Sequence, residues 1–364
     1  MKFSCQKELL LDALLTTAKA AAVKTTIPAL EGLLLELKGD KLSITGYNLD
    51  IGIKTTIDVQ GEEDGNIVMN AKLSGEVIRK MPSGILTMNI DNNAALISSG
   101  ATEFSLACIE ADDYPIMPKV NPETSFSIQQ KLLKNMILQT KFAAAVSDAK
   151  PVLMGCLFEI KDNVLYIVAI DGVRIAMRKE PIQFEDIKFI VPLKTLEEVA
   201  HILSDEEDKN AVICIDRNQI SFDVDNYIMI SRLIDGEFPP YMNHITKEMP
   251  NFADVNTREM VYMLDRTMLI VNEKNKVPLR CEFGDDSIAI RCETSLGKIN
   301  DRINVTYTGE PAVVGFNSKY MLDAFKACDT DCVKMFVGSK VDPIIIKPMQ
   351  GDDFIYLVLP MRLK

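Results

Sequence analysis

A repeat of 123 residues runs through the chain and limits the folds that it can adopt. Sliding the sequence by this interval brings Glu36, Glu159 and Glu282 into coincidence, within the segments LLLELKGDKLSI, CLFEIKDNVLYI and LRCEFGDDSIAI. Each segment alternates apolar and polar residues, passes through a polar turn and alternates again, which is the pattern of a β-hairpin. A match of this length predicts three copies of one domain.

The second half of each copy repeats as well. VMNAKLSGEVIRKM, IVPLKTLEEVAHIL and VVGFNSKYMLDAF each run from a strand pattern into a helical pattern, with Lys72, Lys194 and Lys319 at the same point. We therefore expect an α+β fold of three tandem domains, each with two helices packed on antiparallel sheets. The connectors ADDYPIMPKVNPE and DGEFPPYMNHITKEMP separate the domains. The predicted bounds are 1–121, 122–246 and 247–364.

Composition indicates where the protein resides. The chain of 364 residues is 47% apolar, but it contains no apolar run long enough to cross a membrane. Its polar start, MKFSCQKELL, leads directly into a helical pattern, so we expect no signal peptide and a cytoplasmic protein. Most of the eight cysteines lie within apolar strand patterns, which favours buried free thiols in a reducing cytosol over disulfides.

The first helix of the first domain and the first helix of the second domain have clear sequence patterns. The one in the first domain carries an apolar stripe, for which we expect Leu9, Leu10, Ala13, Leu14 and Ala18. The one in the second domain is predicted over residues 129–146 and carries Lys131, Lys134 and Lys141, with Lys150 just beyond. The matching helix of the third domain, over residues 257–272, is less regular.

The net charge of −12 argues against a protein that holds nucleic acid by bulk attraction, because that mode needs a basic footprint. It does not argue against a protein that surrounds DNA. In a protein that surrounds DNA, lysines on the helices would line the central hole through which the DNA passes. The acidic helix after Lys194 indicates that this lining is not uniformly basic. The alternative is that these lysines are ordinary solvated helix faces.

Catalytic patterns are incomplete. Ser147 and Lys150 have the S-x-x-K spacing of serine acyl-enzymes, but no S-D-N or K-T-G follows. Cys328 and Cys332 could form half of a zinc site, yet the only histidines, His201 and His244, supply no second cluster. The carboxylates of Asp329, Asp331, Asp352 and Asp353 are typical of solvated turns. We expect no enzyme, no metal and no cofactor.

Three tandem copies of such a domain predict an arc with helices on its inner side. An arc exposes sheet edges at both ends, and head-to-tail pairing of two chains would close it into a ring of six domains. The apolar residues Phe104 and Leu106 in the first domain, with Leu269 and Ile270 in the third, are candidates for this dimer interface. Alternatively, these four fill their own cores, and the protein is a self-assembling scaffold that never meets DNA.

Three segments carry a resemblance to a known family. The span PVLMGCLFEIKDNVLYIVAIDGVRIAM, the connector LIDGEFPPY and the terminus YLVLPMRL closely resemble the bacterial DNA polymerase III β subunits, the sliding clamps. The resemblance covers the whole chain. It implies three clamp-type domains, a homodimeric ring around duplex DNA, and no catalysis or cofactor. Its implied partners are the replicative polymerase, the clamp loader and repair proteins, which bind through short peptide motifs.

The resemblance also implies a client-peptide pocket between the second and third domains. Carried over by position, its lining is Leu153, Ile170, Gly172, Val173, Arg174, Ile175, Pro239, Asn243, His244, Val341, Leu359, Pro360, Met361 and Arg362. Leu153 and Ile170 also fit a purely structural role in the core. Departures from the family pattern at Ile170, Val173, Asn243 and His244 suggest a different peptide preference.

Lys24 and Lys72 match positions where the family places DNA-contacting arginines. A lysine is a point charge without the guanidinium fork, so contacts with phosphate should be independent of sequence. The candidate DNA-binding residues are Lys24, Lys72, Lys131, Lys134, Lys141, Lys150 and Lys194.

Overall fold

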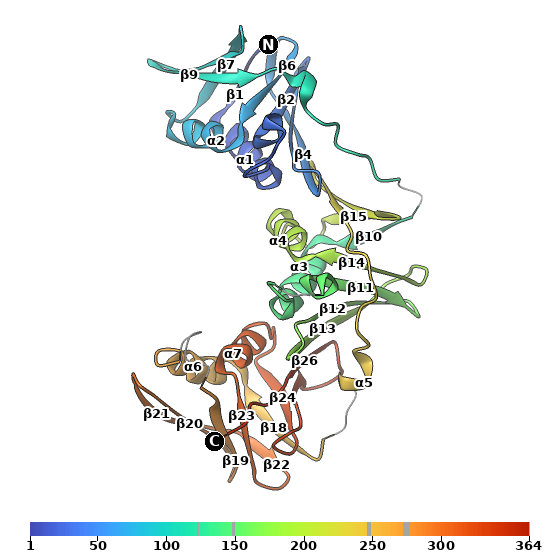
Figure 1. Ribbon diagram of the computed structural model, residues 1–364, viewed down its shortest axis with the longest axis vertical. Coiled ribbons are helices and arrows are strands. Elements are labelled where there is room, and N and C mark those ends of the chain that lie inside the picture. Colours follow the sequence, from blue (N-terminus) through green and yellow to red (C-terminus); the bar gives the residue numbers. More distant parts are fainter. Residues whose placement is uncertain (122–123, 148–149, 246–248, 272–276, 364) are drawn as a thin grey trace. The chain divides into compact units, whose positions relative to one another are not determined.

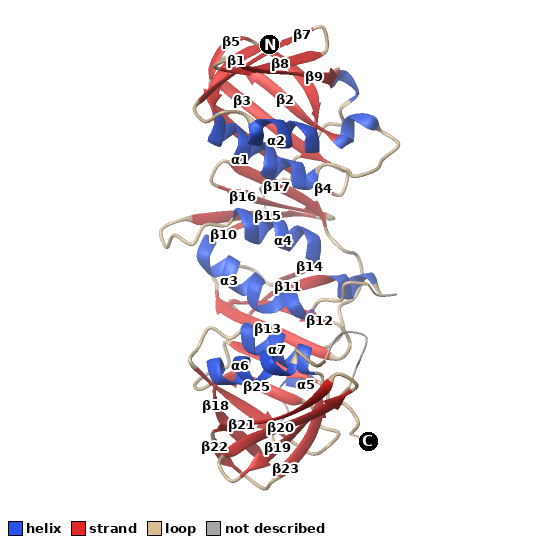
Figure 2. Cartoon of the chain, turned by 90° about the vertical axis from the view of Figure 1, so that its left-hand side faces the viewer, coloured by secondary structure: helices blue, strands red, loops and turns tan. Residues whose placement is uncertain are grey.

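The computed structural model describes residues 1–121, 124–147, 150–245, 249–271 and 277–363, and its ribbon is shown in Figure 1. These residues form two compact units. The first contains residues 1–134 and 194–233, and the second contains residues 135–193 and 234–364. In each unit the longer helices lie on one side of the strands (Figure 2). No helix in the described ranges has the length and apolar character needed to span a bilayer.

A thirteen-stranded antiparallel sheet organises the first unit. Its strand order is β10-β15-β16-β17-β4-β3-β2-β6-β9-β8-β7-β1-β5. The strands are β1 (Lys2–Gln6), β2 (Gly32–Lys38), β3 (Lys41–Tyr47), β4 (Ile51–Asp58), β5 (Gln60–Glu63), β6 (Gly65–Asn70), β7 (Ile85–Asp91), β8 (Ala94–Ser99), β9 (Thr102–Ile109), β10 (Ser125–Gln129), β15 (Asn210–Asp216), β16 (Gln219–Val224) and β17 (Tyr227–Arg232). The helices are α1 (Lys7–Thr17), α2 (Ala71–Lys80) and α4 (Leu193–Ile202). Helix α3 (Gln130–Thr140) begins in the first unit and ends in the second.

The second unit has two sheets, a nine-stranded one in the order β14-β11-β12-β13-β26-β25-β24-β18-β22 and a four-stranded one in the order β21-β20-β19-β23. The strands are β11 (Gly155–Lys161), β12 (Val164–Ile170), β13 (Arg174–Pro181), β14 (Ile187–Pro192), β18 (Asn251–Asn256), β19 (Leu279–Gly284), β20 (Ser287–Thr294), β21 (Gly297–Asn304), β22 (Thr306–Thr308), β23 (Ala312–Phe316), β24 (Cys332–Val337), β25 (Ile344–Pro348) and β26 (Phe354–Val358). The helices are α5 (Met242–Ile245), α6 (Thr257–Thr267) and α7 (Ser318–Lys326).

The predicted repeat is confirmed in the strand register. Each repeat places its glutamate in a hairpin where it faces the residue seven positions later: Glu36 faces Ser43, Glu159 faces Tyr166 and Glu282 faces Ala289. The later strand-to-helix segments are also present, as β6–α2, β14–α4 and β23–α7. The chain therefore contains three tandem copies of one α+β domain.

The helix ends differ from the sequence prediction. Helix α3 ends at Thr140 rather than at residue 146, and a 3-10 turn over Lys141–Ala143 follows it. Helix α6 ends at Thr267 rather than at residue 272, which lies outside the described residues. In each repeat the first helix ends at a fully buried threonine whose hydroxyl donates to the carbonyl four residues earlier: Thr17 to Ala13, Thr140 to Met136 and Thr267 to Met263.

The predicted apolar stripe of the first helix is confirmed except at its ends. Leu10, Ala13, Leu14 and Thr17 are the buried residues of α1, at the three- and four-residue spacing of one helix face. Leu9 lies at the edge of this face and is exposed, where it lines a hollow together with residues of the neighbouring strands. Ala18 lies beyond the end of α1 and packs only partly against the core.

Candidate functional site

Most of the residues predicted to line a peptide pocket lie in the second unit around the pairing of β13 with β26. Arg174 faces Val358 in this ladder, and the amide of Leu359 donates to the carbonyl of Val173 at 2.9 Å. Strand β13 belongs to the second repeat and β26 to the third. One sheet therefore continues from the second domain into the third at this point.

A tight turn over residues 171–173 joins β12 to β13 and carries two of the predicted residues, Gly172 and Val173. The side-chain Oδ1 of Asp171 accepts hydrogen bonds from the amides of Val173 and Arg174, both at 3.0 Å. Gly172 has a φ of 90°, a conformation that favours glycine. The turn leaves the side chain of Val173 exposed.

Buried apolar residues lie beneath this turn. Leu153, Ile170 and Ile175 belong to a hydrophobic cluster that also contains Tyr241 and Ile245. Since the first three are almost fully buried, they pack in the core. This is the structural role that the sequence left open for Leu153 and Ile170. Exposed members of the predicted lining are Gly172, Val173, Asn243, His244, Val341, Leu359 and Arg362, and Pro239, Pro360 and Met361 are half-buried.

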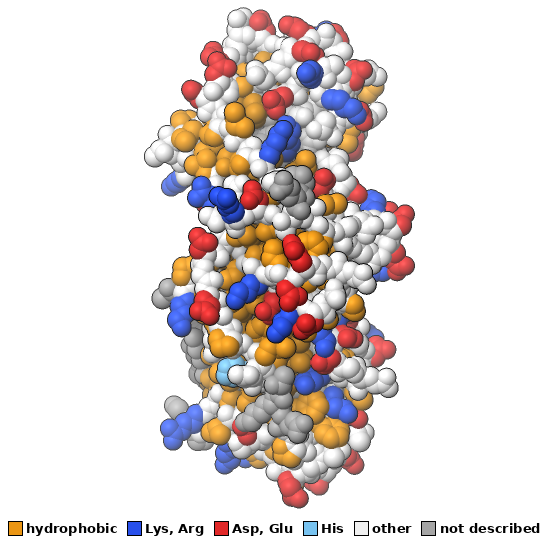
Figure 3. Space-filling view, turned by 90° about the vertical axis from the view of Figure 1, so that its right-hand side faces the viewer, with side chains coloured by type: hydrophobic (Ala, Val, Ile, Leu, Met, Phe, Trp, Pro, Cys, Tyr) orange, Lys and Arg blue, Asp and Glu red, His pale blue; other side chains and the backbone are white. Residues whose placement is uncertain are grey.

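The connector that contains α5 is fixed to the second domain by a tyrosine. The hydroxyl of Tyr241 donates to the carboxylate of Glu159 at 2.6 Å, and burial together with that carboxylate raises the pKa of Tyr241. The carbonyl of Tyr241 accepts from the amide of His244 at 3.0 Å. The hydrogen bond between Tyr241 and Glu159 was not predicted from the sequence. Figure 3 shows the side that carries α5, where hydrophobic side chains are exposed between charged ones.

Two exposed methionines are neighbours of predicted lining residues in the sequence. Met154 follows the buried Leu153, and Met242 precedes Asn243. Flexible thioether side chains adapt to varied apolar partners.

The C-terminal tail is held against β23. The amide of Met361 donates to the carbonyl of Gly315 at 2.7 Å. A Cβ atom on Gly315 would lie 2.5 Å from the carbonyl oxygen of Met361 and 2.7 Å from a methyl carbon of Leu363. This close approach requires glycine at position 315, and it places the tail over an edge of the four-stranded sheet.

The predicted DNA-binding lysines have unequal surroundings. Lys131 and Lys134 are paired with Glu207 at 3.0 Å and Asp205 at 2.8 Å, so part of their charge is compensated within the first unit. Lys24, Lys72 and Lys194 are exposed, and no carboxylate of the described residues lies within ion-pair distance of them. Lys141 is half-buried in the 3-10 turn after α3, and Lys150 is exposed.

The predicted dimer residues lie near two sheet edges. Strand β9 pairs with β8 over Thr102–Ala107, whereas it pairs with β6 only at Cys108 and Ile109. Strand β21 is the last strand of its sheet and pairs with β20 alone. Among the described residues, therefore, one side of β21 and most of one side of β9 have no partner strand.

The apolar candidates at these edges divide into exposed and buried ones. Phe104 on β9 is 40% exposed and Leu269, just after α6, is 80% exposed. Phe104 also lines a hollow of about 450 Å³ with Leu73, Glu76, Val77, Arg79 and Lys80. Ile270 is half-buried, with its side chain close to Gly297 at the start of β21. Leu106 belongs to the core of its own domain, which is the alternative that the sequence left open.

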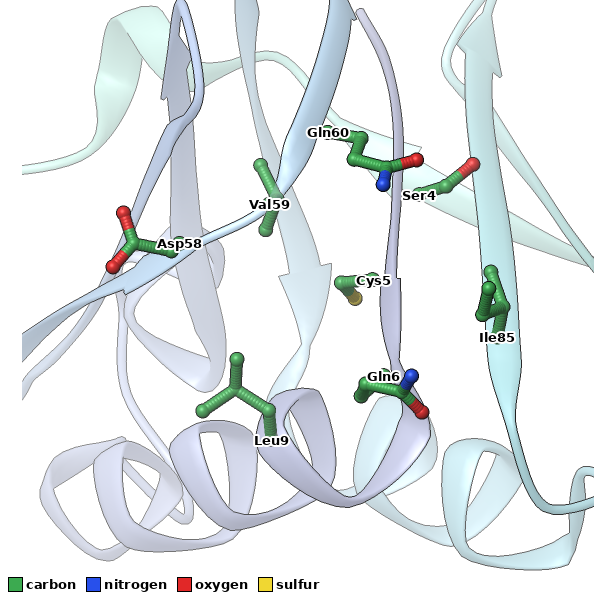
Figure 4. Close-up of a pocket in the computed structure, with 8 residues that line it drawn as sticks. All are labelled: Ser4, Cys5, Gln6, Leu9, Asp58, Val59, Gln60 and Ile85. Carbon is green, nitrogen blue, oxygen red and sulfur yellow. The ribbon is translucent and has the colours of Figure 1, made fainter.

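A second hollow in the first unit offers no evident chemistry. It measures about 270 Å³ and is lined by Ser4, Cys5, Gln6, Leu9, Asp58, Val59, Gln60 and Ile85 (Figure 4). Burial raises the pKa of the Cys5 thiol to about 11, so this thiol stays protonated at neutral pH. None of the residues predicted to contact DNA, a peptide or the partner chain lines this hollow. In the described ranges, no group of three or more histidine, cysteine or acidic side chains is arranged to hold a metal ion.

Comparison with known proteins identifies the family. Family models of the DNA polymerase III beta subunit match in three parts: the N-terminal domain at residues 1–118, the central domain at 127–240 and the C-terminal domain at 243–362. The beta sliding clamps of Halalkalibacterium halodurans and Staphylococcus aureus are each 31% identical to this chain and are matched over 100% of it, and over 100% and 99% of their own lengths.

Solved structures agree with this result. The DNA polymerase sliding clamp of Bacillus subtilis is 30% identical and superimposes with a TM-score of 0.94, with 100% of both chains covered. The sliding clamp of Pseudomonas aeruginosa bound to griselimycin is 26% identical, with a TM-score of 0.93 and the same coverage. The chain therefore belongs to the DNA polymerase III beta subunit family, whose members are sliding clamps: processivity factors of DNA replication that are not enzymes.

Proposed function

We propose that two copies of this chain close head to tail into a ring that encircles duplex DNA in the cytoplasm and tethers the replicative polymerase to it. The observation that carries this proposal is the pair of open edges at β9 and β21, which belong to the first and the third domain. Both strands have eight residues, so pairing between two chains would satisfy the backbone groups of both. Eight free cysteines are consistent with a reducing compartment.

Side chains at the open edges of β9 and β21 are suited to an interface between two chains, here called the seam. Glu103 on β9 is acidic, whereas β21 carries the basic residues Arg302 and Lys298, of which Lys298 is already paired with Glu293 at 2.6 Å. The exposed side chain of Leu269 is a suitable apolar group for the hollow beside Phe104 on the partner chain. Burying a leucine side chain contributes about 1.5–3 kcal/mol per contact, and a twofold ring contains two such contacts.

Contact with DNA would come from the exposed lysines. Lys24, Lys72 and Lys194 have no carboxylate partner among the described residues, and we assign them the strongest contacts with phosphate. Lys131, Lys134, Lys141 and Lys150 would contribute less. In a molecule with a net charge of −12, a few lysines give a weak, salt-sensitive attraction that permits sliding. Enclosure would then supply the residence time on DNA.

Client peptides would bind where the second domain meets the third. The proposed pocket has an apolar floor at Leu153, Ile170 and Ile175, and its rim includes Val173 and Leu359. Clamp loader and repair proteins would use the same site. Burial of two or three apolar anchors, less the entropy of ordering the peptide, predicts an affinity of roughly micromolar, which allows clients to exchange. We assign the domains to residues 1–121, 122–246 and 247–364.

Retention on circular DNA tests this proposal. The protein is loaded by a clamp loader onto a circular DNA plasmid, and the complex is moved into 1 M salt, a concentration at which the Debye length is only about 3 Å. We expect the protein to remain bound to the circle and to leave after a restriction enzyme has cut it. Rapid loss from the uncut circle would refute enclosure.

A further inference from the structure

The side chain of Arg174 is occupied by contacts inside the protein. Its Nε donates to Asp171 Oδ2 at 2.8 Å, and its Nη1 donates to Asp323 Oδ2 at 2.8 Å. Only 11% of the arginine side chain is exposed, and both carboxylates are also largely buried. Charge-assisted hydrogen bonds of this kind are stronger than neutral ones. Little of the guanidinium is left for a bound ligand.

Aromatic rings complete the environment of this guanidinium. Its central carbon lies 4.3 Å from the ring centre of Tyr320 and 5.6 Å from that of Phe142. Phe142 in turn packs edge-on against Tyr356 at 5.4 Å. A planar guanidinium stacks on rings and bonds to two carboxylates at once, which a lysine ammonium does not reproduce.

These contacts connect two domains. Asp171 shapes the turn before β13 through its Oδ1 and binds Arg174 through its Oδ2. Asp323 lies on α7 of the third domain, where Lys319 also binds it at 3.1 Å. The exposed turn at residues 171–173 is therefore attached to a helix 149 residues later in the sequence.

We propose that Arg174 is a positioning residue that holds the turn at residues 171–173 in its peptide-binding shape by attaching it to α7. This inference rests on the proposed client pocket and changes the role of Arg174 in it. The sequence resemblance places Arg174 in the lining, whereas its burial and its two carboxylate partners leave contact with the client to Val173 and Leu359. Asp323, which is absent from the predicted lining, becomes necessary for client binding.

Hydrogen exchange in the free protein tests the attachment without any ligand. Asp323→Asn keeps the side-chain shape and removes the charge that Arg174 binds. We expect the amides of Val173, Arg174 and Leu359 to exchange about tenfold faster, because the turn opens locally more often. Asp352→Asn is the matched control, since it removes the 2.6 Å ion pair to Lys179 on the same strand, β13, without touching the turn. Unchanged exchange in Asp323→Asn would overturn the proposal.

Binding of griselimycin, the ligand in the Pseudomonas aeruginosa clamp structure, tests whether loss of the attachment weakens the proposed pocket. We expect Asp323→Asn and Arg174→Lys each to weaken binding in calorimetry by about tenfold, and the double variant to be no weaker than either, since both remove the same attachment. Weak binding by Arg174→Lys alone, with Asp323→Asn unchanged, would show that Arg174 contacts the ligand directly and would refute the positioning role. If the unaltered protein does not bind griselimycin, the proposed pocket fails, and hydrogen exchange still decides whether Arg174 holds the turn.

Discussion

The cysteine at position 156 is buried completely at the start of β11, in the second domain. Its burial raises the pKa of the thiol to about 12, with a smaller opposing effect from the Thr140 hydroxyl, the same group that ends α3. The thiol therefore stays protonated, acts as a small apolar group and is a poor nucleophile. Cys332 is exposed by contrast.

The raised pKa of Cys156 predicts that the stability of the protein depends on pH. The pKa of Cys156 rises from an unfolded value of 9.0 to about 12 in the folded protein. Between these values the unfolded chain loses a proton that the folded chain keeps, so the free energy of unfolding falls as pH rises, by up to about 1.4 kcal/mol per pH unit. Urea unfolding at pH 8, 9 and 10 should show a shallower fall for Cys156→Ala than for the unaltered protein.

Cys332→Ala serves as the control, because it removes a thiol from an exposed position instead of a buried one. The cavity made by Cys156→Ala lowers stability at every pH and therefore does not affect the comparison of slopes. Equal slopes for all three proteins would contradict a protonated buried thiol at position 156.

At the level of single elements, the sequence predicts what is local. The hairpins and the strand-to-helix segments follow from periodicity within about twenty residues, and they occur where expected. The end of α3 at Thr140 could not be predicted in this way, because the burial of Thr140 depends on packing in the folded domain and not on the local sequence pattern. The pairing of Arg174 with Asp323 could not be predicted either, since its partners are far apart in the sequence.

The C-terminal tail is an element whose place depends on one glycine. Gly315→Val should displace the tail, because the new side chain would overlap the carbonyl of Met361 and the side chain of Leu363. With griselimycin as the probe of the proposed pocket, we expect the affinity to fall at least tenfold while the protein stays folded and keeps the proposed dimer. Deletion of residues 361–364 should abolish binding. Calorimetry and sedimentation measure the two properties.

A matched change on the same strand separates the tail from general damage to β23. Val313→Ala removes apolar volume from a half-buried position of that strand and leaves the Met361 contact at Gly315 in place. It should therefore lower the free energy of unfolding without lowering the affinity for griselimycin. Unchanged affinity in the deletion variant would show that the tail takes no part in the pocket.

At the scale of the whole molecule, charge and topology have separate roles. The ion pairs of Lys131 and Lys134 with acidic side chains reduce the attraction that a count of lysines would suggest. Such surface pairs contribute little to stability, but they do lower the local positive potential. With this charge balance, the proposed ring is what would keep the protein on DNA, and its closure would depend on the proposed seam between chains.

The seam can be tested by one substitution at an exposed leucine. Leu269→Asp should convert the dimer into a folded monomer, because it places a charge where an apolar contact is proposed, and burial of an unpaired charge is strongly unfavourable. Ile116→Asp is the matched control, since Ile116 is 92% exposed and lies outside the proposed seam. Sedimentation should give half the mass for Leu269→Asp alone. That variant should also leave uncut circular DNA quickly. Its affinity for griselimycin should equal that of the unaltered protein, because the proposed pocket lies within one chain. A Leu269→Asp protein that remains dimeric would place the seam elsewhere.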